Sequence, residues 1–174
     1  MDLRPATALD LPDIARLHES NWRRDYANVL PEIALGARLS DYMAATWHGG
    51  ALIDHRVIAA RDEDDRLMGF AAMQDEGPHG CAYLDALHVA PKARAQGVGR
   101  ALMTAIAVLS MPGALSLEVL SANRPARAIY RRWGGRETSE FQDTILDVSV
   151  PAVAVGWRDT AALLDRLRGG SGNV

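Results

Sequence analysis

The sequence has only one cysteine, Cys81, among its 174 residues. A single thiol excludes an intramolecular disulfide, and we expect Cys81 to be a small core residue. The sequence also lacks an apolar run long enough to span a bilayer, and its start, MDLRPATALD, lacks the basic and apolar blocks of a secretory signal. We therefore expect a cytoplasmic protein with no membrane partner.

No charge of one sign dominates. Lys and Arg number 19 against 22 Asp and Glu, for a net charge of -3. Such a balance creates no strong field for a polyphosphate backbone or anionic lipid, so we expect no nucleic-acid partner. The histidines are scattered and no two share a helical turn beside a carboxylate, so we expect no metal. They are His18, His48, His55, His79 and His88.

The length and composition indicate one compact domain. A hydrophobic content of 48% with 24% charged residues is typical of globular proteins, and 174 residues suit a single core. The last residues, GGSGNV, have the composition of a flexible segment. We therefore predict one domain over residues 1–168 and a flexible tail over 169–174, without repeats or a linker.

The hydrophobic periodicity predicts an α/β fold in which helices flank both sides of a mixed sheet. Strands 81–89 and 115–120 enclose a helix and should be parallel, and we expect 136–152 to be irregular. Strands are expected at residues 3–7, 57–61, 67–74, 81–89, 115–120 and 153–157. Helices are expected from Asp10, as the capping residue, to Trp22, then at 31–47, 98–109, 123–133 and 158–167.

The stretch RAQGVGRALM, residues 94–103, places Gly97 and Gly99 where an alternating run gives way to a helical one. The first amides of a helix are unpaired and carry partial positive charge, which favours an anion. Glycine lets a bulky diphosphate approach them closely. Ordinary turn punctuation explains two glycines equally well. Leu102 excludes the dinucleotide fingerprint, and no GK[ST] follows.

Several segments together resemble the GNAT superfamily of acetyl-CoA-dependent N-acetyltransferases. Arg94-x-x-Gly97-x-Gly99 is similar to that family's pyrophosphate loop, and LHVAP resembles the strand end that holds pantetheine. SANRPARAIYRRWGG resembles its second cofactor motif, with Asn123, Tyr130 and Gly134 in the matching places. The two departures, Trp133 before that glycine and Gly135 after it, affect packing detail.

The resemblance implies a cofactor, acetyl-CoA, bound between splayed strands 81–89 and 115–120. The Val89 amide is the expected donor to the thioester carbonyl. The alternative reading of His88 is a surface histidine. The resemblance implies these cofactor-binding residues: Leu87, His88, Val89, Arg94, Ala95, Gln96, Gly97, Val98, Gly99, Arg100, Asn123, Ala126 and Tyr130.

A general base is needed because a free alkylamine, with a pKa near ~10.4, is mostly protonated at neutral pH. From the family's habits, Glu118 is the leading candidate, directly or through water, and Asp85 and Tyr83 are rivals. Each has a simpler interpretation. Glu118 can be a solvated strand residue, and Asp85 can hold a neighbouring loop by a hydrogen bond. The Tyr83 ring can simply pack in the fold while its hydroxyl contacts water.

Tyr130 resembles the family's general acid. A phenol of pKa ~10 can protonate or hydrogen-bond a thiolate whose thiol has a pKa near ~8.5. Its simpler role is a place on a buried stripe with Ala126, Ile129 and Trp133, and Asn123 can be an N-cap alone.

Trp22 and Tyr26 lie where the family has its acceptor-site lid, so we expect them to line the substrate pocket, with helix packing as the alternative. The predicted reaction is direct transfer of acetyl to a primary amine of a small molecule or peptide in a ternary complex. A catalytically weak acyl-CoA-binding regulatory module is the other hypothesis. The last strand and helix offer a contact for a homodimer.

Overall fold

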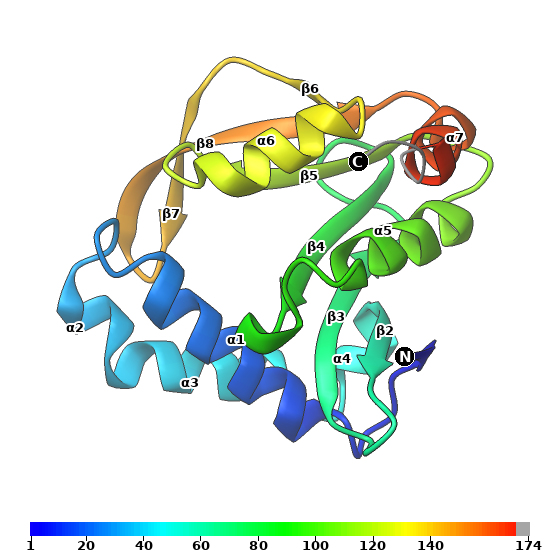
Figure 1. Ribbon diagram of the computed structural model, residues 1–174. Coiled ribbons are helices and arrows are strands. Elements are labelled where there is room, and N and C mark those ends of the chain that lie inside the picture. The colour runs from blue at the N-terminus through cyan, green and yellow to red at the C-terminus, as the bar shows by residue number, and fades with distance from the viewer. Residues whose placement is uncertain (170–174) are drawn as a thin grey trace.

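The computed structural model describes residues 1–169, which form a mixed sheet with helices on both faces (Figure 1). The strand order is β1-β2-β3-β4-β5-β8-β6, and β7 also pairs with β8. The strands are β1 (Asp2–Pro5), β2 (Arg56–Arg61), β3 (Leu67–Gln74), β4 (Ala82–Val89), β5 (Leu115–Leu120), β6 (Arg136–Glu137), β7 (Phe141–Ile145) and β8 (Val148–Trp157). The predicted α/β class with a mixed sheet is confirmed.

Two apolar clusters cover the two faces of this sheet. One cluster joins the sheet to α5, α6 and α7, and Leu102, Ile106 and Leu163 are fully buried in it. The other joins the opposite face to the N-terminal helices through Ile14 and Leu39. The helices are α1 (Leu11–Asp25), α2 (Glu32–Leu35), α3 (Ala37–Thr46), α4 (Ala51–Asp54), the 3-10 turn η1 (Pro91–Ala93), α5 (Val98–Leu109), α6 (Arg124–Arg132) and α7 (Thr160–Gly169).

Strands β4 and β5 are parallel neighbours, as predicted, but they pair only at their beginning. Ala82 faces Leu115 and Tyr83 faces Ser116, and the register ends there. From that point β4 continues its pairing with β3 alone, and β5 continues with β8 alone. The two central strands therefore part after Tyr83, and a gap opens in the middle of the sheet (Figure 1).

The expectation of an irregular stretch over 136–152 is wrong. Strands β6 and β7 lie within it, and β8 begins at Val148 rather than Val153. Asp143 interrupts the inward face that Phe141 and Ile145 form on β7, and Pro151 stands inside β8. Both residues weaken the apolar alternation by which a strand is recognised. Strand β8 pairs with β5 through Ala152–Trp157 on one side, and with β7 and β6 on the other.

The N-terminal helices also differ from expectation. Helix α1 continues to Asp25, three residues beyond Trp22. The helix expected over 31–47 is divided into α2 and α3 at Gly36, and α4 was not anticipated. The predicted stripe on α6 is only partly buried, because Ile129 is 42% exposed while Tyr130 is 9% exposed.

Asp10 is the N-cap residue of α1 by position, but its side chain does not cap the helix. Its carboxylate accepts hydrogen bonds from the Thr7 amide at 2.7 Å, from Arg4 at 2.8 Å and from Arg61 at 2.6 Å. Asp10 and Arg61 are both buried. The predicted capping role is therefore wrong, and Asp10 instead ties α1 to β1 and β2.

Two further observations concern the described part of the chain. None of its helices combines the length and the apolar character that a membrane crossing requires. The predicted tail beyond Gly169, the last residue of α7, lies outside the described residues.

Candidate active site

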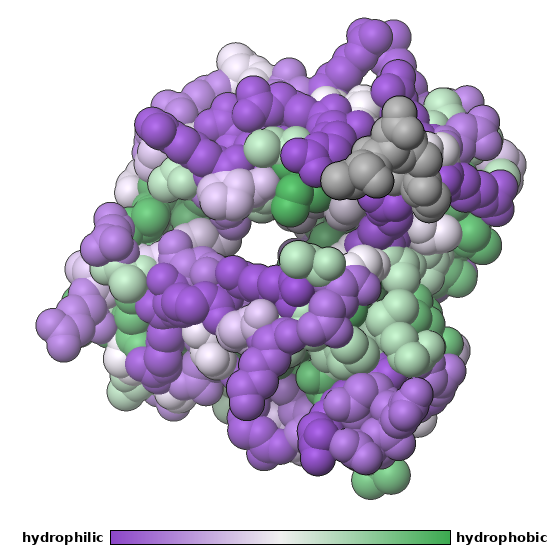
Figure 2. Space-filling model, viewed as in Figure 1, coloured by the Kyte–Doolittle hydropathy of each residue, from purple (hydrophilic) through white to green (hydrophobic). Residues whose placement is uncertain are grey.

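A cavity of about 1240 Å³ occupies the gap between β4 and β5 and extends over the last turn of α1. Figure 2 shows an opening through the middle of the molecule with a largely hydrophilic rim. The structure brings every site residue predicted from the sequence to this cavity. They are Trp22, Tyr26, Tyr83, Asp85, Leu87, His88, Val89, Arg94, Ala95, Gln96, Gly97, Val98, Gly99, Arg100, Glu118, Asn123, Ala126 and Tyr130.

The open edge of β4 presents backbone donors to the gap. The Ala90 amide donates to Met68 on β3 at 2.8 Å. Because amides alternate in direction along a strand, the Leu87 and Val89 amides point away from β3, toward the parted side. The Val89 carbonyl on that edge accepts a hydrogen bond from the side-chain amide of Asn21 at 3.2 Å. Two amides therefore remain for a ligand that lies along the strand.

The start of α5 forms the second group of donors. The first hydrogen bond inside this helix runs from the Ala101 amide to the Gly97 carbonyl at 2.9 Å. The amides of Val98, Gly99 and Arg100 precede it, so they have no carbonyl partner within the helix. Their partial positive charge lies at one end of the cavity.

Glycine stands at the two positions of this loop for different physical reasons. Gly97 has φ +80°, a left-handed conformation that side chains rarely adopt. Gly99 has no such conformation, and a Cβ there would meet only Val89 Cγ2, at an ordinary 3.6 Å. Neither backbone nor packing requires glycine at 99, although glycine weakens a helix. The absence of a side chain there leaves the cavity open beside the first amides of α5.

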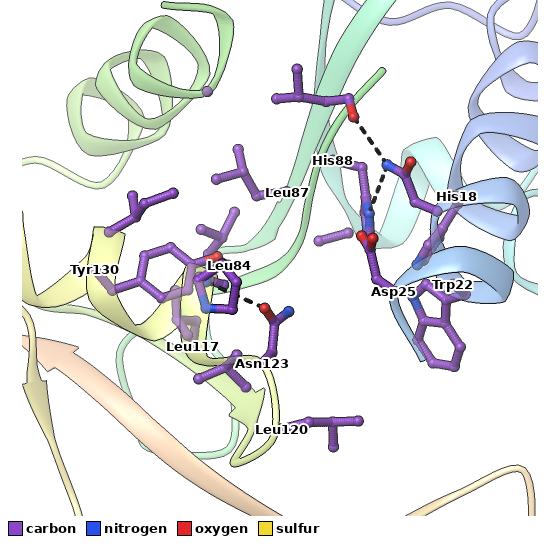
Figure 3. Close-up of a pocket in the computed structure, with 18 of the residues that line it drawn as sticks. His18, Trp22, Asp25, Leu84, Leu87, His88, Leu117, Leu120, Asn123 and Tyr130 are labelled. Atoms are coloured by element: carbon purple, nitrogen blue, oxygen red, sulfur yellow. Dashed lines mark hydrogen bonds between the residues drawn. The ribbon is translucent and has the colours of Figure 1, made fainter. Parts of the chain in front are cut away.

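Tyr130 and Asn123 come to the cavity from α6, on the wall opposite His88 and Trp22 (Figure 3). Asn123 is the N-cap of α6, and its side-chain oxygen accepts from the Ala126 amide at 3.3 Å. Tyr130 packs edge-on against Trp133 and Trp157, with ring centres 6.1 and 6.0 Å apart. Burial raises the pKa of Tyr130 well above that of a free phenol. Its hydroxyl therefore holds its proton at neutral pH.

The three candidate bases gather where β4 and β5 part. Tyr83 lies at the last paired position, and burial raises the pKa of its phenol, with the Glu118 carboxylate adding to the rise. The register of β3 against β4 skips Asp85, which is therefore a bulge residue. The carboxylate of Asp85 lies 3.4 Å from His55 Nε2, and that of Glu118 lies 3.1 Å from His79 Nε2.

His88 is not the surface histidine of the alternative interpretation. Its ring stacks on Phe70 with centres 5.5 Å apart and lies 4.2 Å from that of His18. Burial lowers the pKa of His88 to about 4, so the ring is neutral at physiological pH. The Trp47 indole donates to His18 Nδ1 at 3.0 Å, and neutral His18 therefore carries its hydrogen on Nε2.

The comparisons with known proteins agree with this geometry. The sequence profile of the acetyltransferase (GNAT) family matches residues 14–135. The chain belongs to the GNAT acetyltransferase family. It is 28% identical to an uncharacterised N-acetyltransferase, YuaI, of Bacillus subtilis over 169 residues, which is 92% of this chain and 95% of that protein. The predicted family and the predicted N-acetyltransferase activity are thereby confirmed.

Solved GNAT structures share the fold. A GCN5-related N-acetyltransferase from Rhodopseudomonas palustris superposes with a TM-score of 0.74 at 17% identity, over 90% of this chain and 94% of that one. The PaiA N-acetyltransferase from Thermoplasma acidophilum, solved in complex with coenzyme A, superposes with a TM-score of 0.65 at 16% identity, over 90% and 98%. The cofactor of GNAT enzymes is acetyl-CoA, as predicted.

The residues present fit this cofactor. Space over Gly99, three amides at the start of α5 and two on the edge of β4 suit a diphosphate joined to an extended amide chain. Among residues 1–169, no group of three or more His, Cys, Asp or Glu side chains is placed to hold a metal ion.

Sequence reasoning missed several residues of the cavity wall. Asp25, the last residue of α1, pairs with Arg94 at 3.0 Å. Asn21 bonds the Val89 carbonyl, and Tyr42 stacks on Trp22 with centres 5.9 Å apart. These contacts join segments far apart in the chain, so no local sequence pattern predicts them. Cys81 is half-buried rather than a core residue, and it donates to Ser116 Oγ at 3.4 Å.

Proposed function

We propose that this GNAT enzyme transfers acetyl from acetyl-CoA directly to a primary amine of a small molecule or peptide, with both substrates bound at once. The observation that carries the proposal is that one cavity is lined by the edge of β4, by the start of α5 and by the carboxylates near the point where β4 and β5 part. Cys81 is not among the residues that line it, which favours direct attack over an acetyl-cysteine.

The cofactor half is formed by backbone donors. Acetyl-CoA supplies the acetyl group as an activated thioester. The amides of Val98, Gly99 and Arg100 would hold its diphosphate. The Leu87 and Val89 amides would bind the pantetheine chain and stabilise the negative charge that develops on the thioester oxygen. Fixed donors of this kind need no reorganisation during the reaction.

The acceptor half is aromatic and acidic. Trp22 and Tyr42 stack with their planes 28° apart. The carboxylates of Asp85, Glu118 and Asp143 line the same part of the cavity and all act on Tyr83. Aromatic faces and carboxylates both attract an ammonium group. The acceptor would therefore arrive as a cation and lose a proton before it attacks.

Tyr130 would assist the departure of the thiol. Its raised pKa makes complete proton transfer to a thiolate less favourable than for a free phenol. A hydrogen bond from its hydroxyl to the sulfur fits this better, and the amine then supplies the proton that the thiol finally carries.

Release of free thiol from acetyl-CoA in a panel of amines tests the proposal. We expect one or more primary amines to release thiol in proportion to acetylated product. Tyr130→Phe should lower kcat about tenfold to a hundredfold and leave the affinity for coenzyme A unchanged. Coenzyme A binding without thiol release from any amine would favour the regulatory-module hypothesis instead.

A further inference from the structure

Two carboxylates at the point where β4 and β5 part each face a histidine, and the two pairs differ in their access to water. Asp85 faces His55 at 3.4 Å, and the His55 side chain is 14% exposed. Glu118 faces His79 at 3.1 Å, and the His79 side chain is 41% exposed. The reaction must release one proton to the surroundings, so this difference has a chemical consequence.

The Asp85 pair is a poor route for that proton. The hydrogen bond to Asp85 raises the pKa of His55, which favours a charged imidazolium beside the carboxylate. Within the described residues, His55 Nδ1 is buried and has no hydrogen-bond partner. His55 Nε2 also lies 3.1 Å from Gln74 Nε2, and with Nδ1 buried and unpartnered the ring offers no path for a proton from Asp85 to solvent. Asp85 and His55 therefore form a structural pair, which agrees with the loop-holding role considered for Asp85.

The Glu118 pair has the opposite arrangement. Glu118 lies on β5 two residues after the last pairing with β4, and its side chain lines the cavity. His79 belongs to the loop between β3 and β4, and it is not among the cavity-lining residues. One edge of its ring therefore contacts the carboxylate from outside the cavity, and the ring is open to water.

From this juxtaposition we propose that His79 takes the proton that Glu118 removes from the acceptor amine and releases it to water. The inference rests on the proposed amine acetylation. The ammonium gives one proton to Glu118 Oε1. Protonated Glu118 donates it to His79 Nε2, with the other hydrogen on Nδ1, and Nδ1 then loses its hydrogen to solvent. Proton exchange with water returns the exposed ring to the tautomer with its hydrogen on Nδ1, which leaves Nε2 free for the next cycle. The amine nitrogen bonds the acetyl carbon, the C–S bond breaks, and the second amine proton ends on the thiol.

Other titratable groups surround this path. Burial raises the pKa of Tyr83 on β4, and the carboxylates of Glu118, Asp85 and Asp143 raise it further. Asp143 reaches this point from β7. The negative charge of these carboxylates attracts the ammonium group of the acceptor. The same charge disfavours a further negative charge, such as a Tyr83 phenolate, where β4 and β5 part. A proton left on Glu118 would block the next cycle, so an imidazole in contact with water is useful there. His79 acts through Glu118 and does not touch the substrate.

Variants of His79 test the proposal when they are compared with the wild type on an amine for which the wild type releases thiol. His79→Gln can still hydrogen-bond Glu118 but cannot carry a proton, and His79→Ala leaves space for added imidazole. Both should lose about tenfold in kcat, with KM for the amine changed less than about twofold, and imidazole should restore His79→Ala. The exposed His48, distant along the chain in the α3–α4 turn, gives the control His48→Gln, which should keep its kcat.

A double variant separates a proton path from a structural role. Glu118→Gln should lose at least about a hundredfold in kcat, and His79→Gln should add nothing in that background, because both act in one step. Unchanged kcat in His79→Gln would overturn the proposal, as would a loss that imidazole leaves uncorrected. A wild-type enzyme inactive toward every amine would instead contradict the proposed function, and the path with it.

Discussion

Arg94, in the loop between η1 and α5, lies 3.0 Å from Asp25, the last residue of α1, so an ion pair joins the two sides of the cavity. Asp25 also accepts a hydrogen bond from Arg24 at 2.8 Å. Burial alone would raise the pKa of Asp25, but the bonds to Arg24 and Arg94 outweigh it and lower that pKa. The carboxylate is therefore charged, and it holds an arginine that the diphosphate would also attract.

The first prediction follows from this competition. Asp25→Asn should tighten coenzyme A binding by about twofold to fivefold, because it frees Arg94 and removes a negative charge near the diphosphate. Arg94→Ala should weaken binding by a similar factor. Titration calorimetry at low salt measures both. Glu63→Gln, in the exposed β2–β3 turn and outside the cavity lining, removes the same charge and should change nothing. Weaker binding in Asp25→Asn would contradict the competition.

Alanine substitutions at Gly97 and Gly99 should distinguish an effect on fold stability from an effect on coenzyme A binding. Gly97→Ala forces a left-handed alanine and should cost about 1 kcal/mol of unfolding free energy. Gly99→Ala should leave the stability unchanged or raise it by up to about 1 kcal/mol. Both should lose about tenfold in coenzyme A affinity, and Gly49→Ala, which meets no atom within 4 Å, should lose none. Chemical denaturation and calorimetry test this, and full affinity in Gly99→Ala would contradict a diphosphate at this site.

The Asp10 cluster should make stability depend on acidity. Arg4 above all, with the Thr7 amide and Arg61, lowers the pKa of Asp10 against the opposing effect of burial. A carboxyl whose folded pKa is depressed stabilises the fold above its unfolded value of ~3.9, and it loses that contribution as pH falls below it. Asp10→Asn should cost about 3 kcal/mol at pH 7.

Thermal unfolding from pH 7 to pH 2.5 measures this effect. Wild type and Asp10→Asn should differ most at neutral pH and converge as the medium becomes acidic. A constant difference in Tm at every pH would show that the charge of Asp10 is not what stabilises this corner of the fold.

His88 should titrate far below an ordinary histidine. Because burial lowers its pKa to about 4, its ring should stay neutral from pH 8 down to about 5. The unfolded value is near ~6.5, so its contribution to stability is complete above that pH and declines as pH falls toward 4. Proton NMR of the histidine rings follows the midpoint directly. A midpoint near 6.5 would mean that the ring leaves the pocket of His18 and Phe70 in solution.

The sequence indicated cavity residues with a local backbone pattern better than contacts between distant segments, for a physical reason. Gly97 and Asn123 owe their residue types to backbone geometry next to themselves, and such effects leave a local pattern. The pairs Asp25–Arg94 and His79–Glu118 join residues 69 and 39 positions apart, so only the folded chain brings them together.

The missed elements show the same limit. Strand β7 was overlooked because Asp143, which lines the cavity, interrupts its apolar face. A residue that serves a cavity weakens the pattern by which its own strand is recognised. Gly36 divides the predicted second helix for the related reason that helical periodicity continues across a break in the backbone.

Amide hydrogen exchange with and without coenzyme A reports on the backbone donors in the gap between β4 and β5, on which cofactor binding is proposed to depend. Coenzyme A should slow exchange at Leu87, Val89 and the amides of residues 98–100, and should leave the β1–β2 pair on the far edge unchanged. Slower exchange confined to other segments, with Leu87 and Val89 unaffected at saturating coenzyme A, would contradict cofactor binding at these donors.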